Sequence, residues 1–117
     1  MSENNLKAAI IDLIRFHGGL AIRVNSGAIR RPGAVYYFAK WYVLGDDEQT
    51  AGVSDILAVL NGVAIAVETK LPGNQPTEAQ RLFLEEWQER GGLAILAYSV
   101  EGFIKAVNYH FGKTVIQ

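Results

Sequence analysis

The chain has 117 residues, a net charge of −1 and no cysteine. The absence of cysteine excludes disulfides and thiolate metal sites, and two lone histidines, His17 and His110, argue against a zinc centre. Half of the residues are hydrophobic, which is enough for one core, so we expect a single domain over residues 1–117. We find no apolar run of membrane-spanning length and no signal-peptide pattern, and we therefore expect an intracellular, cytoplasmic protein with no membrane partner.

The first predicted element is a helix that begins after Ser2, a favourable N-cap residue, and ends at Gly18-Gly19. Its apolar stripe at helical spacing consists of Leu6, Ile10, Leu13, Ile14 and His17. Glu3 continues this stripe backwards. Its carboxylate either faces a functional site or stabilises the helix dipole as a first-turn acid, and the sequence leaves both readings open.

A basic and aromatic region follows this helix. Residues 20–25 predict a strand that ends in the turn Asn25-Ser26-Gly27, which either holds a phosphate or is only a turn. Because the net charge is −1, nucleic-acid binding would need a local basic patch. The residues that could form one are Arg23, Arg30, Arg31, Lys40 and Lys70. The aromatic and β-branched composition of residues 34–44 predicts one long strand or a hairpin arm. This segment either stacks against bases, forms a dimer interface or belongs to the ordinary core packing.

The most informative segment is a hairpin over residues 52–70. Asn61-Gly62 between two apolar runs predicts a two-residue turn, and that register places Asp55 directly opposite Glu68. Lys70 projects from the same face. Opposed carboxylates destabilise a buried strand end unless a cation lies between them, so the pattern favours a Mg²⁺ or Mn²⁺ site with a catalytic lysine. The alternative is a surface ion pair between Glu68 and Lys70.

The second half of the chain predicts a helix, a strand and a last helix. Thr77 and Gln80 have the capping-box spacing, so Gln80 is explained by helix capping alone. Residues 93–98 predict a strand and residues 102–109 a short helix. The order predicts an α/β domain with a central mixed sheet flanked by helices.

The pattern Gly52-x-Ser54-Asp55, then Glu68-x-Lys70, then Gln80 at a helix start resembles the VRR-NUC (virus-type replication-repair nuclease) branch of the PD-(D/E)xK nucleases. The resemblance extends over nearly the whole chain, and Ser54 departs from the proline that is usual in the family. It implies the PD-(D/E)xK, restriction-endonuclease-like core. It also implies a metal-dependent endodeoxyribonuclease, of a kind that a phage could encode.

The resemblance and the residue pattern together give a set of expected site residues. The expected catalytic residues are Asp55, Glu68, Lys70 and Gln80. The expected ligands of Mg²⁺ or Mn²⁺ are Asp55, Glu68, the carbonyl of Thr69 and Glu3. Asn25, Ser26, Arg30 and Arg31 are the expected contacts to nucleic acid. Small relatives suggest an endonuclease that cuts branched DNA such as a four-way (Holliday) junction. We also expect a homodimer, because a symmetric dimer brings two active sites to the two strands. A restriction-like nuclease, a single-strand nuclease and a non-catalytic nucleic-acid-binding module are the alternatives.

Overall fold

The main sheet is mixed and has four strands. The computed structural model describes residues 1–117 and orders these strands β1 (Leu20–Arg23), β4 (Ile56–Leu60), β5 (Val63–Thr69) and β6 (Leu93–Ala97). The β1–β4 and β4–β5 pairs are antiparallel, and β5 and β6 are parallel. The parallel pair is joined through α2 (Glu78–Glu89), which supplies the long crossover that such a pair requires. The predicted α/β class with a mixed sheet is confirmed.

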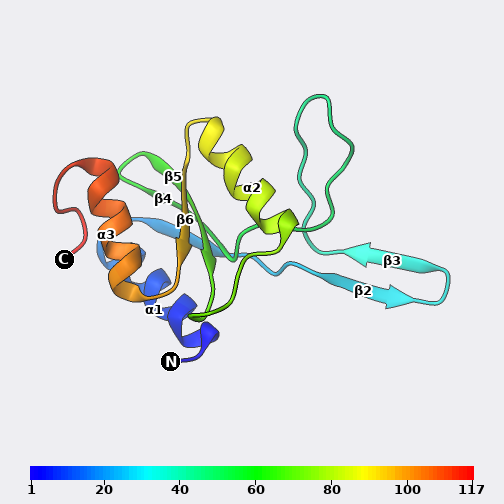
Figure 1. Cartoon of the computed structure of the whole chain (residues 1–117), viewed down its shortest axis with the longest axis horizontal. Coiled ribbons are helices and arrows are strands. Elements are labelled where there is room, and N and C mark those ends of the chain that lie inside the picture. The colour runs from blue at the N-terminus through cyan, green and yellow to red at the C-terminus, as the bar shows by residue number, and fades with distance from the viewer.

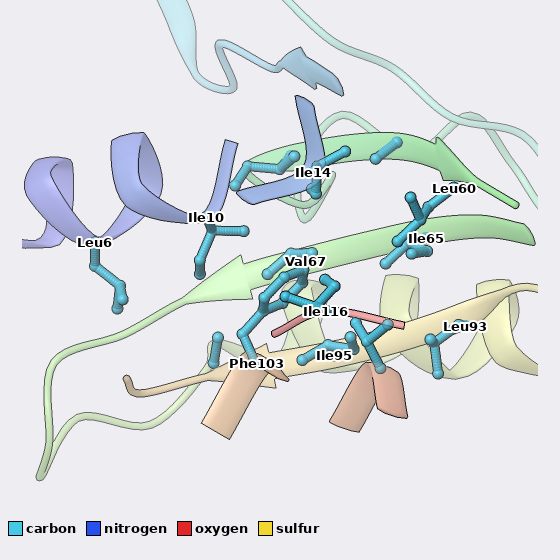
Figure 2. Close-up of a cluster of buried hydrophobic side chains, with 14 residues drawn as sticks. Leu6, Ile10, Ile14, Leu60, Ile65, Val67, Leu93, Ile95, Phe103 and Ile116 are labelled. Carbon is cyan, nitrogen blue, oxygen red and sulfur yellow. The ribbon is translucent and has the colours of Figure 1, made fainter. Parts of the chain in front are cut away.

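Helices cover both faces of this sheet (Figure 1). On one face, α1 (Glu3–Phe16) and α3 (Val100–Phe111) pack on the strands and form the larger core, a cluster of 14 buried side chains (Figure 2). On the other face, α2 covers a much smaller cluster of Val53, Ala66 and Phe83. The burial that stabilises the domain is therefore concentrated on the α1 and α3 side.

The β4–β5 hairpin forms as the sequence predicts. Asn61 and Gly62 both have positive φ, 49° and 79°, the requirement of the tight turn that matches strand twist. Leu60 pairs with Val63, and Ile56 pairs with Val67. One step beyond that last pair, the same register brings Asp55 opposite Glu68.

A second, two-stranded sheet projects from the body of the domain (Figure 1). Its strands are β2 (Ala28–Arg31) and β3 (Ala34–Tyr37), joined by Pro32-Gly33 with Gly33 at φ 77°. Pro at the first and a positive-φ Gly at the second central position are typical of a type II turn. We call residues 28–37 the arm.

The aromatic run over residues 34–44 is not one long strand, because only its first four residues pair with β2. After Phe38, whose N–H donates to the Gly27 carbonyl at 3.0 Å, the chain returns to the body. Trp41 then packs edge-on against Phe83 of α2 and donates its indole N–H to the Ala51 carbonyl at 2.7 Å. The run therefore divides into the exposed arm and a segment that Trp41 anchors on α2, in which Tyr42 and Leu44 remain exposed.

The first two helices begin where the sequence predicts, whereas α3 is longer than the predicted helix over residues 102–109, because Ser99 caps it and it begins at Val100. The Ser2, Thr77 and Ser99 side chains accept from backbone N–H groups of the first turns, and Thr77 with Gln80 completes a capping box. The predicted strand over residues 20–25 ends earlier, at Arg23, although the Val24 N–H still donates to the Asp55 carbonyl at 2.8 Å. None of the three helices has the length and apolar character needed to cross a membrane.

Candidate active site

Asp55 lies just before β4 and is held as an anion. Its Oδ2 accepts from the backbone N–H and from the hydroxyl of Thr69, both at 2.8 Å, and Lys7 Nζ lies 3.6 Å from its Oδ1. Burial raises the pKa of Asp55, but hydrogen bonds from Glu68 and Thr69 and the charge of Lys7 outweigh it, so the pKa lies below its usual value. The ionised form of Asp55 is therefore favoured by the fold.

Glu68, near the end of β5, is in the opposite situation. Its side chain is only 2% exposed, and its Oε1 is buried without any hydrogen-bond partner. Burial, together with the neighbouring Asp55 carboxylate, raises the pKa of Glu68 to about 9, against smaller opposing effects of Lys70 and Lys7. An unsatisfied buried carboxyl group is costly to keep in a core. Its position beside a second carboxylate indicates a functional site.

The residues present fit a divalent cation. Asp55 and Glu68 offer hard oxygen ligands on one patch, and Glu68 Oε1 is unpaired. The N–H and C=O of an extended residue point to the same side of its strand, and the N–H of Thr69 points to Asp55. The Thr69 carbonyl is therefore directed to the same side. An ion with few protein ligands, which takes water and phosphate oxygens for the rest, is typical of Mg²⁺.

The expectation for Glu3 is not supported by the geometry. No group of three acidic or histidine side chains is placed to hold a metal ion, so Glu3 does not join Asp55 and Glu68. It begins α1 as a first-turn acid, the position in which a carboxylate stabilises the helix dipole. Lys7, one turn further along the same stripe, reaches Asp55 instead. Lys7 was missed in the sequence, although its helical spacing from Glu3 was a usable signal.

A polar cavity of about 450 Å³ opens beside Asp55, while Glu68 does not line it. Asp55 lines it together with Lys7, Arg23, Asn25 and Ser26. The structure therefore brings the predicted turn residues Asn25 and Ser26 next to Asp55, together with Arg23 of the predicted basic patch, and adds Lys7, which the prediction did not include.

The predicted residues Arg30, Arg31 and Gln80 lie further along. Ser26 also lines a second cavity, of about 310 Å³, with Arg30 and Gln80. Gln80 Oε1 accepts from the Thr77 N–H at 2.8 Å, so the capping interpretation is confirmed, while the Gln80 side chain also borders this cavity. Arg31 is exposed on the arm and lines neither of these two cavities.

Lys70 follows β5 directly. It is half-buried, and its backbone N–H donates to the Ala97 carbonyl of β6 at 3.0 Å, which fixes its backbone at the sheet. The Lys70 charge lowers the pKa of Glu68, although burial and the Asp55 carboxylate outweigh this effect. Two carboxyl groups and an amine thus share one end of the central strands.

Gly52 allows the segment before Asp55 to approach α2. Its φ is 100°, and a Cβ at this position would lie 2.2 Å from the carbonyl oxygen of Ala79. We expect Gly52→Ala to lower the free energy of unfolding by about 3 kcal/mol, because it combines backbone strain with a backbone clash. Gly73→Ala is the matched control, since Gly73 has φ 92° with no atom near the added methyl group. Urea unfolding of both variants measures the difference, and an equal loss in the two would show that the close approach is unimportant.

Comparisons with known proteins give one informative likeness. No family model and no curated protein matches the sequence. Among solved structures, the chain is similar to one described as "VRR_NUC domain", with a TM-score of 0.63 and 19% sequence identity, over 92% of this chain and 96% of that one. The chain therefore has the fold of a VRR_NUC domain over nearly its whole length, as the sequence resemblance implied.

Proposed function

We propose that this chain is a metal-dependent nuclease that hydrolyses phosphodiester bonds in DNA. One observation carries the proposal: Glu68 is buried with an unpartnered carboxyl oxygen beside Asp55 and within reach of the Lys70 charge. A module that only bound nucleic acid would gain nothing from this costly arrangement. The VRR_NUC fold supports the same reading.

The acidic pair would hold Mg²⁺ or Mn²⁺, with Asp55, Glu68 and the Thr69 carbonyl as ligands. The bound ion lowers the pKa of a water molecule and stabilises negative charge on the phosphate. The two hydrogen bonds from Thr69 fix the orientation of Asp55, and Lys7 holds its second oxygen. Such outer contacts keep a ligand in place and are part of a metal site.

Lys70 would act on the reacting groups themselves. Hydrolysis forms a bond between a water oxygen and phosphorus and breaks one bridging P–O bond, and the leaving oxygen takes up a proton. The Lys70 ammonium group orients the attacking water and offsets the charge that develops on the phosphate. Gln80 borders the adjoining cavity, where its side chain can contact the phosphate backbone.

The substrate we propose is branched DNA, and the active form is a homodimer. One domain presents one site, whereas a symmetric dimer presents two sites to the two strands of a junction. The test is cleavage of labelled four-way junction, flap, duplex and single-stranded DNA in Mg²⁺, with the mass in solution measured by light scattering. Paired nicks on the junction by a dimer would support this substrate. Faster cleavage of matched duplex or of single strands would favour a restriction-like or single-strand nuclease, and metal-independent binding without cleavage would favour a non-catalytic module.

Without metal, the stability of the protein should fall as the pH rises. The pKa of Glu68 is about 9 in the folded chain and 4.5 ordinarily, so the folded state binds more protons between these values. Stability contributed by the protonated Glu68 is fully present below about pH 4.5 and is lost as the pH approaches 9. Urea midpoints in EDTA at about pH 6 and about pH 8.5 measure this loss. Glu68→Gln should show a smaller loss, and an identical slope in that variant would contradict the assignment.

A further inference from the structure

We propose that the arm is a duplex-binding element that, with the two cavities that lie between it and Asp55, holds the DNA that flanks the cleavage point. This inference rests on the proposed nuclease function and adds how the substrate is held. Figure 1 shows the arm extending from the body along the longest axis of the molecule, which measures 50 Å. About 15 base pairs of duplex have the same length.

The distribution of charge along the sequence favours a nucleic acid as the partner of the segment that contains the arm. Residues 13–45 contain five Lys and Arg residues and no acid, whereas the rest of the chain holds the other six and all twelve Asp and Glu residues. Within this basic segment, Arg15 pairs with Asp12 and Lys40 pairs with Glu48. The remaining three, Arg23, Arg30 and Arg31, form no ion pair, so their charges are available to phosphates.

Two cavities that share Ser26 lead from Asp55 to the arm. The cavity of about 450 Å³ is lined by Asp55 and Arg23 among others, and the cavity of about 310 Å³ by Arg30 and Tyr37. Ser26 lines both cavities. A strand of DNA with one phosphate at Asp55 would therefore pass Arg23 and Ser26 before it reaches the arm. Cations along such a path provide the electrostatic attraction that holds a phosphate backbone.

The arm itself presents an arginine and a tyrosine on each face. In the β2–β3 register, Ala28 pairs with Tyr37 and Arg30 with Val35, while Ile29 pairs with Tyr36 and Arg31 with Ala34. Alternation along the strands places Arg30 with Tyr37 on one face and Arg31 with Tyr36 on the other. A two-stranded ribbon fits the major groove of B-DNA, where both faces contact the groove walls. An isolated hairpin is only marginally stable in water, so a partner along its length would also order it.

The test compares two charge-matched double variants. Arg30→Gln with Arg31→Gln removes the arm cations, and Lys105→Gln with Lys113→Gln removes two exposed, unpaired cations at the α3 end. All substituted side chains are exposed, so both variants should fold, which thermal melting checks. Binding to labelled duplexes of about 8 and about 25 base pairs is measured in EDTA by fluorescence anisotropy at several salt concentrations.

We expect the arm variant to bind the longer duplex about tenfold more weakly, with a salt slope smaller by about two, while the control binds as the unmodified protein does. The unmodified protein should bind the duplex of about 25 base pairs more tightly than the duplex of about 8 base pairs, and the arm variant should lose this difference in affinity. Equal DNA affinities in the arm variant and the control variant would overturn the inference. Unchanged DNA binding with a loss of dimer mass in the arm variant would also overturn it, because the arm would then be a protein interface. Cleavage by the unmodified protein is measured in parallel, so failure of the nuclease proposal is recognised separately.

Discussion

Asp55→Asn and Glu68→Gln should each reduce DNA cleavage in Mg²⁺ by about a thousandfold or more. Each change removes an anionic ligand and keeps the shape of the side chain, and the charge stabilisation that a bound metal ion provides is worth several kcal/mol. Single-turnover cleavage of a labelled junction measures the rates. Glu89→Gln, an exposed and unpaired glutamate at the end of α2, is the matched control and should cut normally. Cleavage by either site variant at the control rate would reject this site.

The same two variants should change stability in opposite directions in EDTA. Glu68→Gln removes a buried carboxyl group whose ionised form the fold disfavours, so the melting temperature should rise. Asp55→Asn weakens two hydrogen bonds from Thr69 and the contact to Lys7, so stability should fall by about 1 to 3 kcal/mol. Thermal and urea unfolding measure both changes. If both variants changed the melting temperature in the same direction, the fold would not favour the ionised form of Asp55 while disfavouring that of Glu68.

Lys70→Met should lower the cleavage rate by about a hundredfold to ten-thousandfold while the protein still binds metal. The methionine side chain keeps apolar bulk at this half-buried position but cannot orient a water molecule or offset charge on the phosphate. Calorimetric titration with Mn²⁺ measures metal binding, and cleavage is followed on the same samples. Lys105→Met, at an exposed position on α3, is the control. An unchanged rate in Lys70→Met would remove Lys70 from the mechanism.

The acidic pair could be predicted because its geometry is set locally. The Asn61-Gly62 turn fixes the register of β4 and β5, and the register alone determines that Asp55 faces Glu68. The capping box at Thr77 is equally local and formed as predicted. The fold class followed from the order of elements, because a strand, a helix and a strand in that order favour a parallel crossover.

Contacts between distant elements could not be predicted in the same way. Glu3 and Lys7 lie one turn apart on the same face of α1, so which of them reaches Asp55 depends on the position of the helix along its own axis relative to the sheet. The apolar stripe defines the buried face of the helix and does not define this axial position. The opposite electrostatic states of the two acids also depend on long-range packing. Opposed like charges suggest that removing either one relieves repulsion, whereas the hydrogen bonds from Thr69 make Asp55 a stable anion.

The arm could be anticipated only in part. The aromatic composition of residues 34–44 favours strand for the whole segment, and a hairpin arm was one of the two predicted forms. The run divides because Trp41 finds a packing partner in Phe83 and a hydrogen-bond acceptor in Ala51. These partners lie on other parts of the chain, so no local pattern marks the point at which β3 ends.

The most direct test of the central claim is incubation of the purified protein with a labelled four-way junction in Mg²⁺ and, in parallel, in EDTA. We predict shortened DNA fragments in Mg²⁺ and intact DNA in EDTA, with Glu68→Gln leaving the DNA intact in both. Fragments of equal yield in EDTA, or intact DNA in Mg²⁺ and in Mn²⁺ with a folded protein, would contradict the assignment of Asp55 and Glu68 as a metal-dependent nuclease site.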